Sequence, residues 1–320
     1  HTGEVLAIAN LPAYNPNNRA QLSGASLRNR AVVDIFEPGS TLKPLTVAAA
    51  IDAGRVTPRT RISIAPGTLT IGSATIRDAH PADQLTVTQV IQRSSNVGAA
   101  KIALMLQAQV LWELFEQVGF GRESELGFPG EASGKLRPYK TWKPIEQATM
   151  SYGHGISVSL IQLARAYTIF ARDGELLPVS LLKLDVPPRG VPVIAPETAR
   201  AVRAMLELAT HPEGTGPRAQ IMGYRVAGKT GTAHKQENGG YAANKYISSF
   251  VGLAPVSNPR VVIAVMIDEP SNGQYYGGVV AAPVFAKVMQ GTMRVLGVLP
   301  DAPMQPPQMP AKGEEVEEGT

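Results

Sequence analysis

Apolar positions follow a helical spacing in most of the first two thirds of the chain and strand-like runs later on. The spacing predicts helices over Thr41–Ala53, with Gly54 as its C-terminal cap, and over 84–118, Ser159–Arg172 and Pro196–Leu208. Strand-like runs of apolar residues predict β-strands over Val5–Ala9, Tyr224–Ala233, Tyr246–Pro255 and Arg260–Glu269. A last helix is expected over Val279–Leu296, packed across the later strands.

This order of elements predicts an α/β fold. We expect an antiparallel sheet flanked by helices, with an all-helical subdomain of about residues 80–172 inserted into it. The sheet domain and its insertion together are expected to fill residues 1–298. Residues 299–320, rich in Pro, Met and Glu, are expected to form a C-terminal tail with few contacts.

Composition excludes several classes of protein. The 320 residues are 44% hydrophobic and 18% charged, as in ordinary globular proteins, and the absence of cysteine excludes disulfides. The net charge is +4, but the sequence has no dense Lys/Arg run with interleaved aromatic residues, so nucleic-acid binding is not predicted. The chain lacks an 18-residue apolar stretch, and it opens on an apolar run that is typical of folded structure, so we expect a fragment of a longer protein.

Three short motifs carry the candidate chemistry. Ser40-Thr41-Leu42-Lys43 comes first, Ser94-Ser95-Asn96 follows, and Lys229-Thr230-Gly231-Thr232 comes last. Each motif alone is weak, and only the ordered set is specific. The order S-x-x-K, S-x-N, K-T-G is typical of penicillin-binding proteins and serine β-lactamases.

Ser40 and Lys43 suit a nucleophile and its base. Pro38-Gly39 forms a turn that delivers Ser40 to a helix start, where free N–H groups favour developing negative charge. Lys43, less than one helical turn on, lies on the same face. To act as a base near neutral pH, an amine with a reference pKa of about 10.4 must lose roughly three units, through burial or a second cation such as Lys229. Pro44 lacks an N–H, so we expect an irregular first turn.

Other catalytic schemes find little support. A second S-x-x-K, Ser180 to Lys183, follows the S-x-N motif instead of preceding it, and we interpret it as structural. No G-x-S-x-G elbow is present. The histidines show no metal-binding spacing, so neither a metal nor another cofactor is expected, and His154 is interpreted as a non-catalytic loop residue at the cleft.

Longer strings of sequence add a family resemblance. The chain resembles the transpeptidase domain of class B penicillin-binding proteins, most closely those of septal division, over nearly its whole length. The strings that carry the resemblance are Thr2 to Ala7, Tyr14 to Asn18, Phe36 to Thr41, Ser94 to Gly98, Lys229 to Ala233 and Tyr275 to Gly278. The resemblance implies the fold shared by these domains and serine β-lactamases, and cleavage of the D-alanyl-D-alanine end of peptidoglycan stem peptides.

The resemblance also implies a role for each motif. Ser40 forms the acyl-enzyme, with the backbone N–H groups of Ser40 and Thr232 binding the oxyanion. Ser94 relays a proton to the leaving nitrogen, and Asn96 holds the amide of the acyl chain. Lys229 belongs to the catalytic set as well, and it would anchor the substrate carboxylate together with Thr230 and Thr232. The other residues assigned to substrate binding are Ser95, Gly231, Tyr275 and Tyr276, and the two tyrosines would form the aromatic side of the cleft.

Further expectations concern partners and place. β-Lactams should acylate Ser40, and the full-length protein should act with other division proteins from a membrane anchor at the periplasmic face of the inner membrane. One position departs from the family pattern: His234 stands where members commonly carry Lys or Arg. This change should weaken the binding of anionic inhibitor groups.

Two rival functions stay open on the sequence. One is a hydrolase on the same fold, either a D,D-carboxypeptidase or a β-lactamase. An E-x-x-N stretch, as in the common class A β-lactamases, occurs only at Glu269 to Asn272, after the K-T-G motif. The other is a sensor that is acylated by β-lactams without transferring the acyl group.

Overall fold

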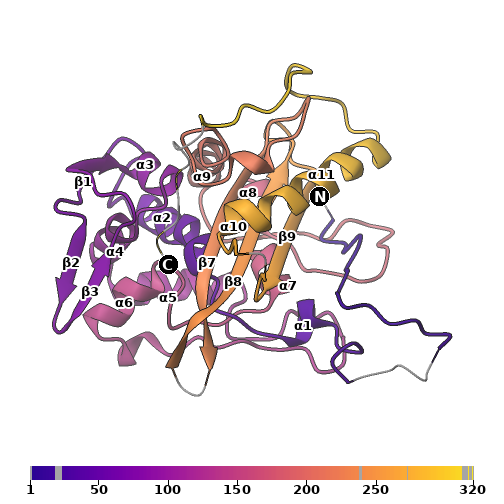
Figure 1. Cartoon of the computed structure of the whole chain (residues 1–320), viewed down its shortest axis with the longest axis horizontal. Coiled ribbons are helices and arrows are strands. Elements are labelled where there is room, and N and C mark those ends of the chain that lie inside the picture. Colours follow the sequence, from indigo (N-terminus) through magenta and orange to yellow (C-terminus); the bar gives the residue numbers. More distant parts are fainter. Residues whose placement is uncertain are drawn as a thin grey trace.

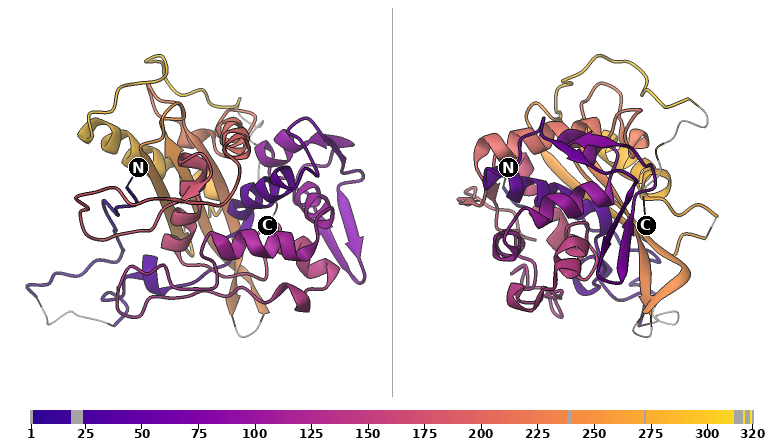
Figure 2. Two further views of the ribbon diagram at one scale, coloured as in Figure 1. Left: turned by 180° about the vertical axis from the view of Figure 1, so that it is seen from behind. Right: turned by 90° about the vertical axis from the view of Figure 1, so that its left-hand side faces the viewer.

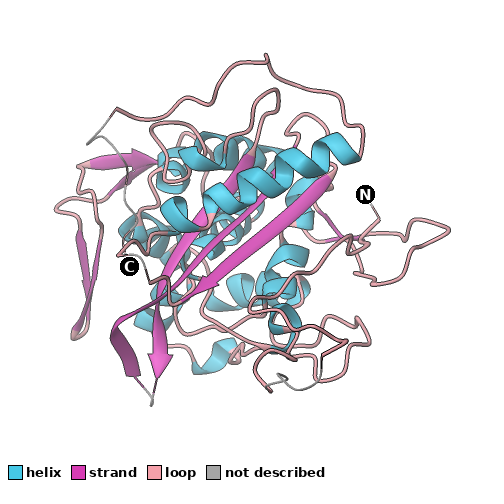
Figure 3. Cartoon of the chain, turned by 45° about the vertical axis from the view of Figure 1, so that its right-hand side comes forward, coloured by secondary structure: helices cyan, strands magenta, loops and turns pink. Residues whose placement is uncertain are grey.

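The computed structural model describes residues 2–18, 24–237, 240–271, 273–311, 316 and 319. Its centre is an antiparallel sheet of β7 (Ala227–Glu237), β8 (Gly240–Ala254) and β9 (Val261–Asp268), in that order. α11 (Ala282–Val295) crosses one face of this sheet (Figure 3). On the other face lie α7 (Leu160–Ala166), α8 (Thr168–Ala171) and α9 (Pro196–Leu208) (Figures 1 and 2).

The middle strand shows how the sequence sets these layers. Successive residues of a strand point to opposite faces. In β8, Phe250 packs against Phe285 of α11 with ring centroids 4.7 Å apart, whereas Val251 and Leu253 join the larger core on the opposite face. Both faces of the central strand are therefore apolar, and the sheet is covered on both sides.

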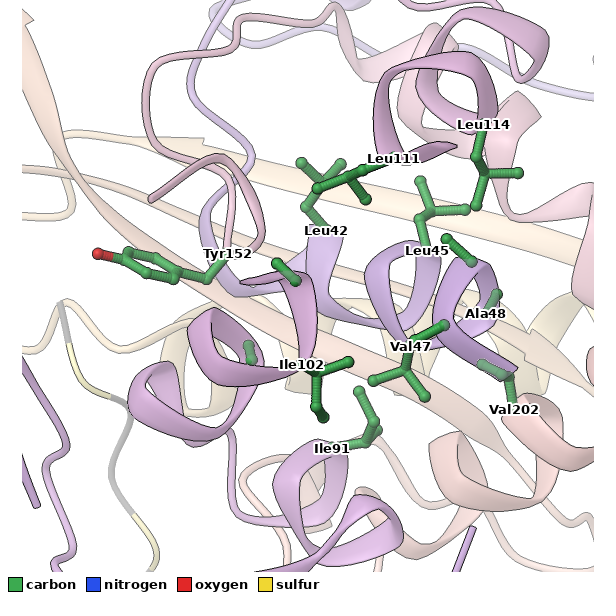
Figure 4. Packing of buried hydrophobic residues seen from close by; sticks show 14 of the residues in the cluster. Leu42, Leu45, Val47, Ala48, Ile91, Ile102, Leu111, Leu114, Tyr152 and Val202 are labelled. Carbon is green, nitrogen blue, oxygen red and sulfur yellow. The ribbon is translucent and has the colours of Figure 1, made fainter. Parts of the chain in front are cut away.

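The larger core surrounds α2 (Lys43–Asp52), which follows a 3₁₀ turn, η2 (Gly39–Leu42). Leu42, Leu45, Val47 and Ala48 are fully buried, and Figure 4 shows side chains from several neighbouring helices around them. A helix that is apolar on all sides belongs inside a protein. The helix that begins beside Ser40 is therefore held rigidly by packing.

A mainly helical region lies beside the sheet (Figure 1). It contains α3 (Val87–Gln92), α4 (Asn96–Leu104), α5 (Ala108–Gln117), η3 (Tyr139–Thr141) and α6 (Pro144–Met150). The expectation of an all-helical insertion is wrong at its start, where β4 (Gln84–Thr86) pairs with β1 (Arg61–Ser63). β2 (Thr68–Ile71) and β3 (Ala74–Arg77), between them in the chain, form a small hairpin that projects from this region. These strands are too short to give a clear alternating pattern.

Several predicted helices are confirmed, one with the predicted ends and others divided into two. Pro196–Leu208 forms a helix with the predicted bounds. The expected helix over Ser159–Arg172 is divided at Tyr167 into α7 and α8, and the last helix is divided at Ala281, before Pro283, into α10 (Gly277–Val280) and α11. The remaining short elements are α1 (Arg30–Val33), β5 (Glu175–Leu176), β6 (Val191–Pro192) and η4 (Pro217–Ala219).

The predicted strand at Val5–Ala9 is wrong. Only a single bridge forms here, between Glu4 and Ser180, with the Val5 N–H donating to the Ser180 carbonyl at 2.8 Å. Residues 5–9 face β9 across a hollow of about 300 Å³ that also reaches α7 and α11. The apolar residues of this segment therefore line the hollow and do not pair in a sheet. Sequence periodicity alone does not predict this difference.

The expectation of a tail with few contacts is also wrong for its first part. The Asp301 carboxylate accepts the backbone N–H groups of Arg225 and Ser257 at 2.7 and 3.1 Å. Gln308 and Gln220 exchange two hydrogen bonds. The acidic positions Glu314, Glu315, Glu317 and Glu318 and the basic Lys312 lie outside the described residues.

Within the described part of the chain, no helix combines the length and the apolar character needed to span a bilayer.

Candidate active site

Lys43 joins the first two motifs. Its amine lies 2.9 Å from the Ser40 hydroxyl and 2.9 Å from the Ser94 hydroxyl, and it donates to the Ser94 carbonyl at 2.5 Å. Lys43 is fully buried, and Ser40 and Ser94 are each 3% exposed. An amine between two hydroxyl groups, shielded from bulk water, has the geometry needed to take a proton from one and pass it to the other.

The local sequence explains the position of Ser40. Gly39 has φ of +57°, a backbone conformation that glycine adopts without steric cost, and it turns the chain into η2. The predicted irregular first turn is confirmed, because η2 is 3₁₀ and the α-helix begins only at Lys43. Thr41 donates to the Pro38 carbonyl at 2.7 Å, and the buried Tyr167 hydroxyl donates to the Thr41 carbonyl at 2.7 Å. Hydrogen bonds and packing thus fix the nucleophile turn.

Ser94 occupies a strained turn between α3 and α4. Its φ is +58°, which costs a residue with a side chain on the order of 1 kcal/mol. The next residue holds the turn. Ser95 caps α4 by accepting the Gly98 N–H at 2.8 Å, and its own hydroxyl donates to Asp78 at 2.6 Å. The assignment of Ser95 to substrate binding is therefore corrected, because its hydroxyl is engaged in capping.

Asn96 has one side of its amide engaged and the other open. Its Nδ2 donates to the Arg77 carbonyl at 3.3 Å, whereas its buried Oδ1 has no hydrogen-bond partner among the described residues. An unpaired buried acceptor is unfavourable in the resting protein. A ligand that donates an N–H to this oxygen would remove that cost.

The third motif lies on β7, and its side chains are buried. The Lys229 amine donates to the Thr230 carbonyl at 3.3 Å and lies 3.2 Å from the Thr230 hydroxyl and 3.5 Å from that of Thr215. A Cβ on Gly231 would lie 2.8 Å from the Pro38 carbonyl, so only glycine lets β7 pack this closely on the nucleophile turn. Thr232 accepts the Gly277 N–H at 2.9 Å. The third motif thus lies against the first.

Thr215 was missed by the sequence reasoning. Its hydroxyl pairs with Thr230, and it lies in a tight Gly-Thr-Gly loop, where a Cβ on Gly214 would lie 2.3 Å from the Ala209 carbonyl. Gly214 and Gly216 do not complete a dinucleotide-binding motif. A threonine between two such glycines gives no signal in the sequence that it will contact Lys229.

The two predicted cleft tyrosines belong to a column of rings. Tyr275 stacks on Tyr246 with centroids 4.0 Å apart, and Tyr276 lies 4.5 Å from Tyr275. His234 continues the column at 4.6 Å from Tyr246, and its Nδ1 lies 3.1 Å from the Ala242 carbonyl. The residue that departs from the family pattern is therefore part of β7, and its ring packs against Tyr246 of β8.

A second group beside Ser40 surrounds Glu37. The rings of Tyr152 and Tyr241 lie 5.1 and 6.0 Å from that of His154. Burial, the largest cause, lowers the pKa of His154 to about 4, so this imidazole is neutral at physiological pH. Burial likewise raises the pKa of Glu37. The sequence reasoning placed His154 at the cleft but missed Glu37 and Tyr241.

Comparison with known proteins agrees with this geometry. The sequence model of the penicillin-binding protein transpeptidase domain matches residues 1–290. The probable peptidoglycan D,D-transpeptidase PenA of Neisseria flavescens is 48% identical over 95% of this chain and 75% of its own length. The peptidoglycan D,D-transpeptidase FtsI of Escherichia coli is 42% identical over 94% of this chain.

The solved transpeptidase domain of penicillin-binding protein 3 from Burkholderia pseudomallei has a TM-score of 0.87 and 49% identity, over 94% of this chain and 87% of that one. The chain spans about half the length of most of the curated relatives it matches, such as 51% of the E. coli protein. The predicted fold class, an antiparallel sheet flanked by helices, is confirmed. By its family match, its relatives and its fold, the chain belongs to the transpeptidase-domain family of class B penicillin-binding proteins.

Proposed function

We propose that this chain is the catalytic part of a peptidoglycan D,D-transpeptidase that cross-links stem peptides during septal wall synthesis. One observation carries the proposal: the buried Lys43 amine lies 2.9 Å from both the Ser40 and the Ser94 hydroxyl groups. The names of the relatives, D,D-transpeptidases of the PenA and FtsI types, support the reaction class, and the FtsI name supports the septal role.

The first half-reaction forms the acyl-enzyme. Ser40 Oγ attacks the carbonyl carbon between the two D-alanines while neutral Lys43 takes the hydroxyl proton. The backbone N–H groups of Ser40 and Thr232 stabilise the oxyanion. As the peptide C–N bond breaks, the proton passes from Lys43 through Ser94 to the leaving nitrogen, and D-alanine departs.

The second half-reaction transfers the acyl group. An amine of a neighbouring stem peptide attacks the ester carbonyl and gives up a proton to the Ser94 and Lys43 pair. As the bond between the acyl carbon and Ser40 Oγ breaks, Lys43 returns a proton to Oγ, and Ser40 is released as the free hydroxyl. In this scheme Lys229, Thr230 and Thr232 bind the terminal carboxylate, Asn96 Oδ1 accepts an N–H of the acyl chain, and Tyr275 and Tyr276 form one wall. β-Lactams acylate the same serine.

We also propose the setting of this reaction. The relatives extend well beyond the matched region. We assign to the full-length protein a membrane anchor, a periplasmic location at the inner membrane and division-protein partners.

Covalent labelling tests the proposal. A fluorescent penicillin should label the wild type, and Ser40→Ala should abolish the label without changing the melting temperature. Ser180→Ala, in the second S-x-x-K stretch, is the matched control and should label normally. Labelling of Ser40→Ala would show that a residue other than Ser40 is the nucleophile.

The fate of the adduct separates the proposed reaction from its rivals. Intact-protein mass spectrometry should show a long-lived penicilloyl adduct, and incubation with a thioester donor and a D-amino acid should yield an exchange product. Rapid loss of the adduct would indicate a hydrolase. A stable adduct without any exchange product would indicate a sensor.

A further inference from the structure

Glu37 joins two other segments to the nucleophile turn. Its Oε1 accepts the Gly155 N–H at 2.7 Å and the Gln236 side-chain N–H at 2.6 Å, and its Oε2 accepts the Tyr241 hydroxyl at 3.0 Å. Gly155 belongs to the turn after α6, whereas Gln236 and Tyr241 belong to the outer part of the β7–β8 hairpin. Glu37 itself is only 5% exposed.

The same segments enclose Gly39, the residue before the nucleophile. On one side, a Cβ on Gly153 would lie 2.3 Å from the Gly39 carbonyl, so the two backbones are in direct contact. On the other side, a Cβ on Gly39 would lie 3.3 Å from the Thr232 carbonyl. The nucleophile turn is therefore held between the 152–155 turn and β7, and Glu37 binds both of these flanks.

The position requires acceptor oxygens. All three groups that reach Glu37 donate to it, and an ionised carboxylate accepts only. An amide with its oxygen in the place of Oε1 still accepts the Gly155 and Gln236 N–H groups, and its NH₂ group can donate to the Tyr241 hydroxyl, whereas an apolar side chain of similar length loses all three bonds. The donors offset part of the cost of burying the charge, which raises the pKa of Glu37.

We propose that Glu37 is a positioning residue for the acylation step. By tying the β7–β8 hairpin and the 152–155 turn to the nucleophile turn, its carboxylate sets the separation between Ser40 and Thr232, whose N–H groups bind the oxyanion. The inference rests on the proposed function and adds a residue to it. Glu37 does not touch the reacting atoms.

The test removes the acceptor oxygens and then restores them. Glu37→Met and Glu37→Gln are compared with wild type by stopped-flow acylation with a fluorescent penicillin, which separates the dissociation constant from the acylation rate constant. A displacement of about 1 Å in an active site can cost roughly 100-fold in rate. Glu37→Met should lose about 10-fold in the acylation rate constant, with the dissociation constant unchanged within about twofold.

Glu37→Gln gives the decisive result. Its amide oxygen, in the place of Oε1, accepts the Gly155 and Gln236 N–H groups, and its NH₂ group donates to the Tyr241 hydroxyl. The acylation rate constant should therefore stay within about threefold of wild type. Glu237→Gln is the matched control, because Glu237 lies on the same hairpin but pairs with Lys245 at 2.6 Å. It should acylate like wild type.

Each other outcome overturns the inference. A wild-type rate in Glu37→Met, a loss confined to the dissociation constant, or a loss in Glu37→Gln as large as that in Glu37→Met would each exclude positioning through these bonds. If Glu37→Met does not fold, Tyr241→Phe removes one bond from a half-exposed ring and should lower the acylation rate constant about threefold; an unchanged rate would again exclude the inference. Absence of labelling in the wild type would instead refute the proposed function.

Discussion

The hydroxyl groups of Thr215 and Thr230 lie 2.7 Å apart, and both are within 3.5 Å of the Lys229 amine. Thr215 therefore supports the part of the site that we assign to the substrate carboxylate. It comes from a loop between α9 and β7 that carries no recognisable motif.

Thr215→Val should lower the second-order rate of penicillin acylation by about 10-fold, because loss of a hydrogen bond linked to a charged group costs on the order of 1.5–3 kcal/mol. The rate is measured by stopped-flow fluorescence. Thr210→Val is the control: the Thr210 hydroxyl donates to the Val226 carbonyl at 2.9 Å, so stability should fall without loss of acylation. Equal acylation by the two variants would remove Thr215 from the site.

Lys43→Met should slow acylation by roughly 1,000-fold at neutral pH, since removal of a general base costs about 10²–10⁴ in rate. Methionine fills much of the buried space that the lysine stem occupies, so the protein should remain folded by circular dichroism. Lys183→Met, in the second S-x-x-K stretch, should acylate normally. A wild-type rate for Lys43→Met would mean that another group takes the proton from Ser40.

Asn96→Ala and Ser95→Ala should have different effects on stability although the residues are adjacent. Asn96→Ala removes an amide whose oxygen is unpaired in the described structure, so the free energy of unfolding should change little while acylation by penicillins with an amide side chain falls. Ser95→Ala removes a helix cap and should cost about 1 kcal/mol of stability. Urea unfolding measures both changes. A large loss of stability in Asn96→Ala would show that its amide serves mainly the fold.

The buried His154 should make stability depend on pH. Its folded-state pKa of about 4 lies below the reference value of 6.5, so between these values the unfolded chain takes up a proton that the native state does not. The free energy of unfolding should therefore fall as the pH drops from 6.5 towards 4, by about 3 kcal/mol in total.

Glu37 works in the opposite direction, because its raised pKa makes the native state take up a proton first as the pH falls. A comparison of His154→Asn with wild type separates the two, since both proteins retain Glu37. The variant should lose most of the acid-side decrease in urea unfolding between pH 7 and pH 5, whereas His211→Asn, at an exposed position, should not. Parallel pH curves for His154→Asn and wild type would refute the buried neutral imidazole.

The sequence predicted the sheet, most long helices and the proximity of Ser40 to Lys43, because these depend on local spacing. A lysine three residues after a serine must lie near it on a helix. The approach of Ser94 to Lys43 was expected only from the ordered motif set and the family resemblance. It depends on a left-handed turn at Ser94 and a cap at Ser95, neither of which has a periodic pattern.

The errors share a physical cause. Val5–Ala9 has the composition of a strand, but composition does not supply a partner strand. Thr215, Glu37 and Tyr241 reach the site through tertiary contacts between distant segments, for which a single sequence carries no signal. Ser95 was assigned to the substrate because it lies inside a motif, although the motif needs it as a helix cap.

The contacts of Asp301 have a practical consequence for how short this domain can be made. Its carboxylate holds the N–H of Arg225, just before β7, and that of Ser257, just after β8, so residues beyond the last helix secure one end of the strand that carries Lys229. Truncation after Val298 would release both groups to solvent. A chain that ends where the Pro-, Met- and Glu-rich composition begins would therefore have a less firmly held sheet. A chain that ends after Pro310 would retain these bonds and the Gln220–Gln308 pair.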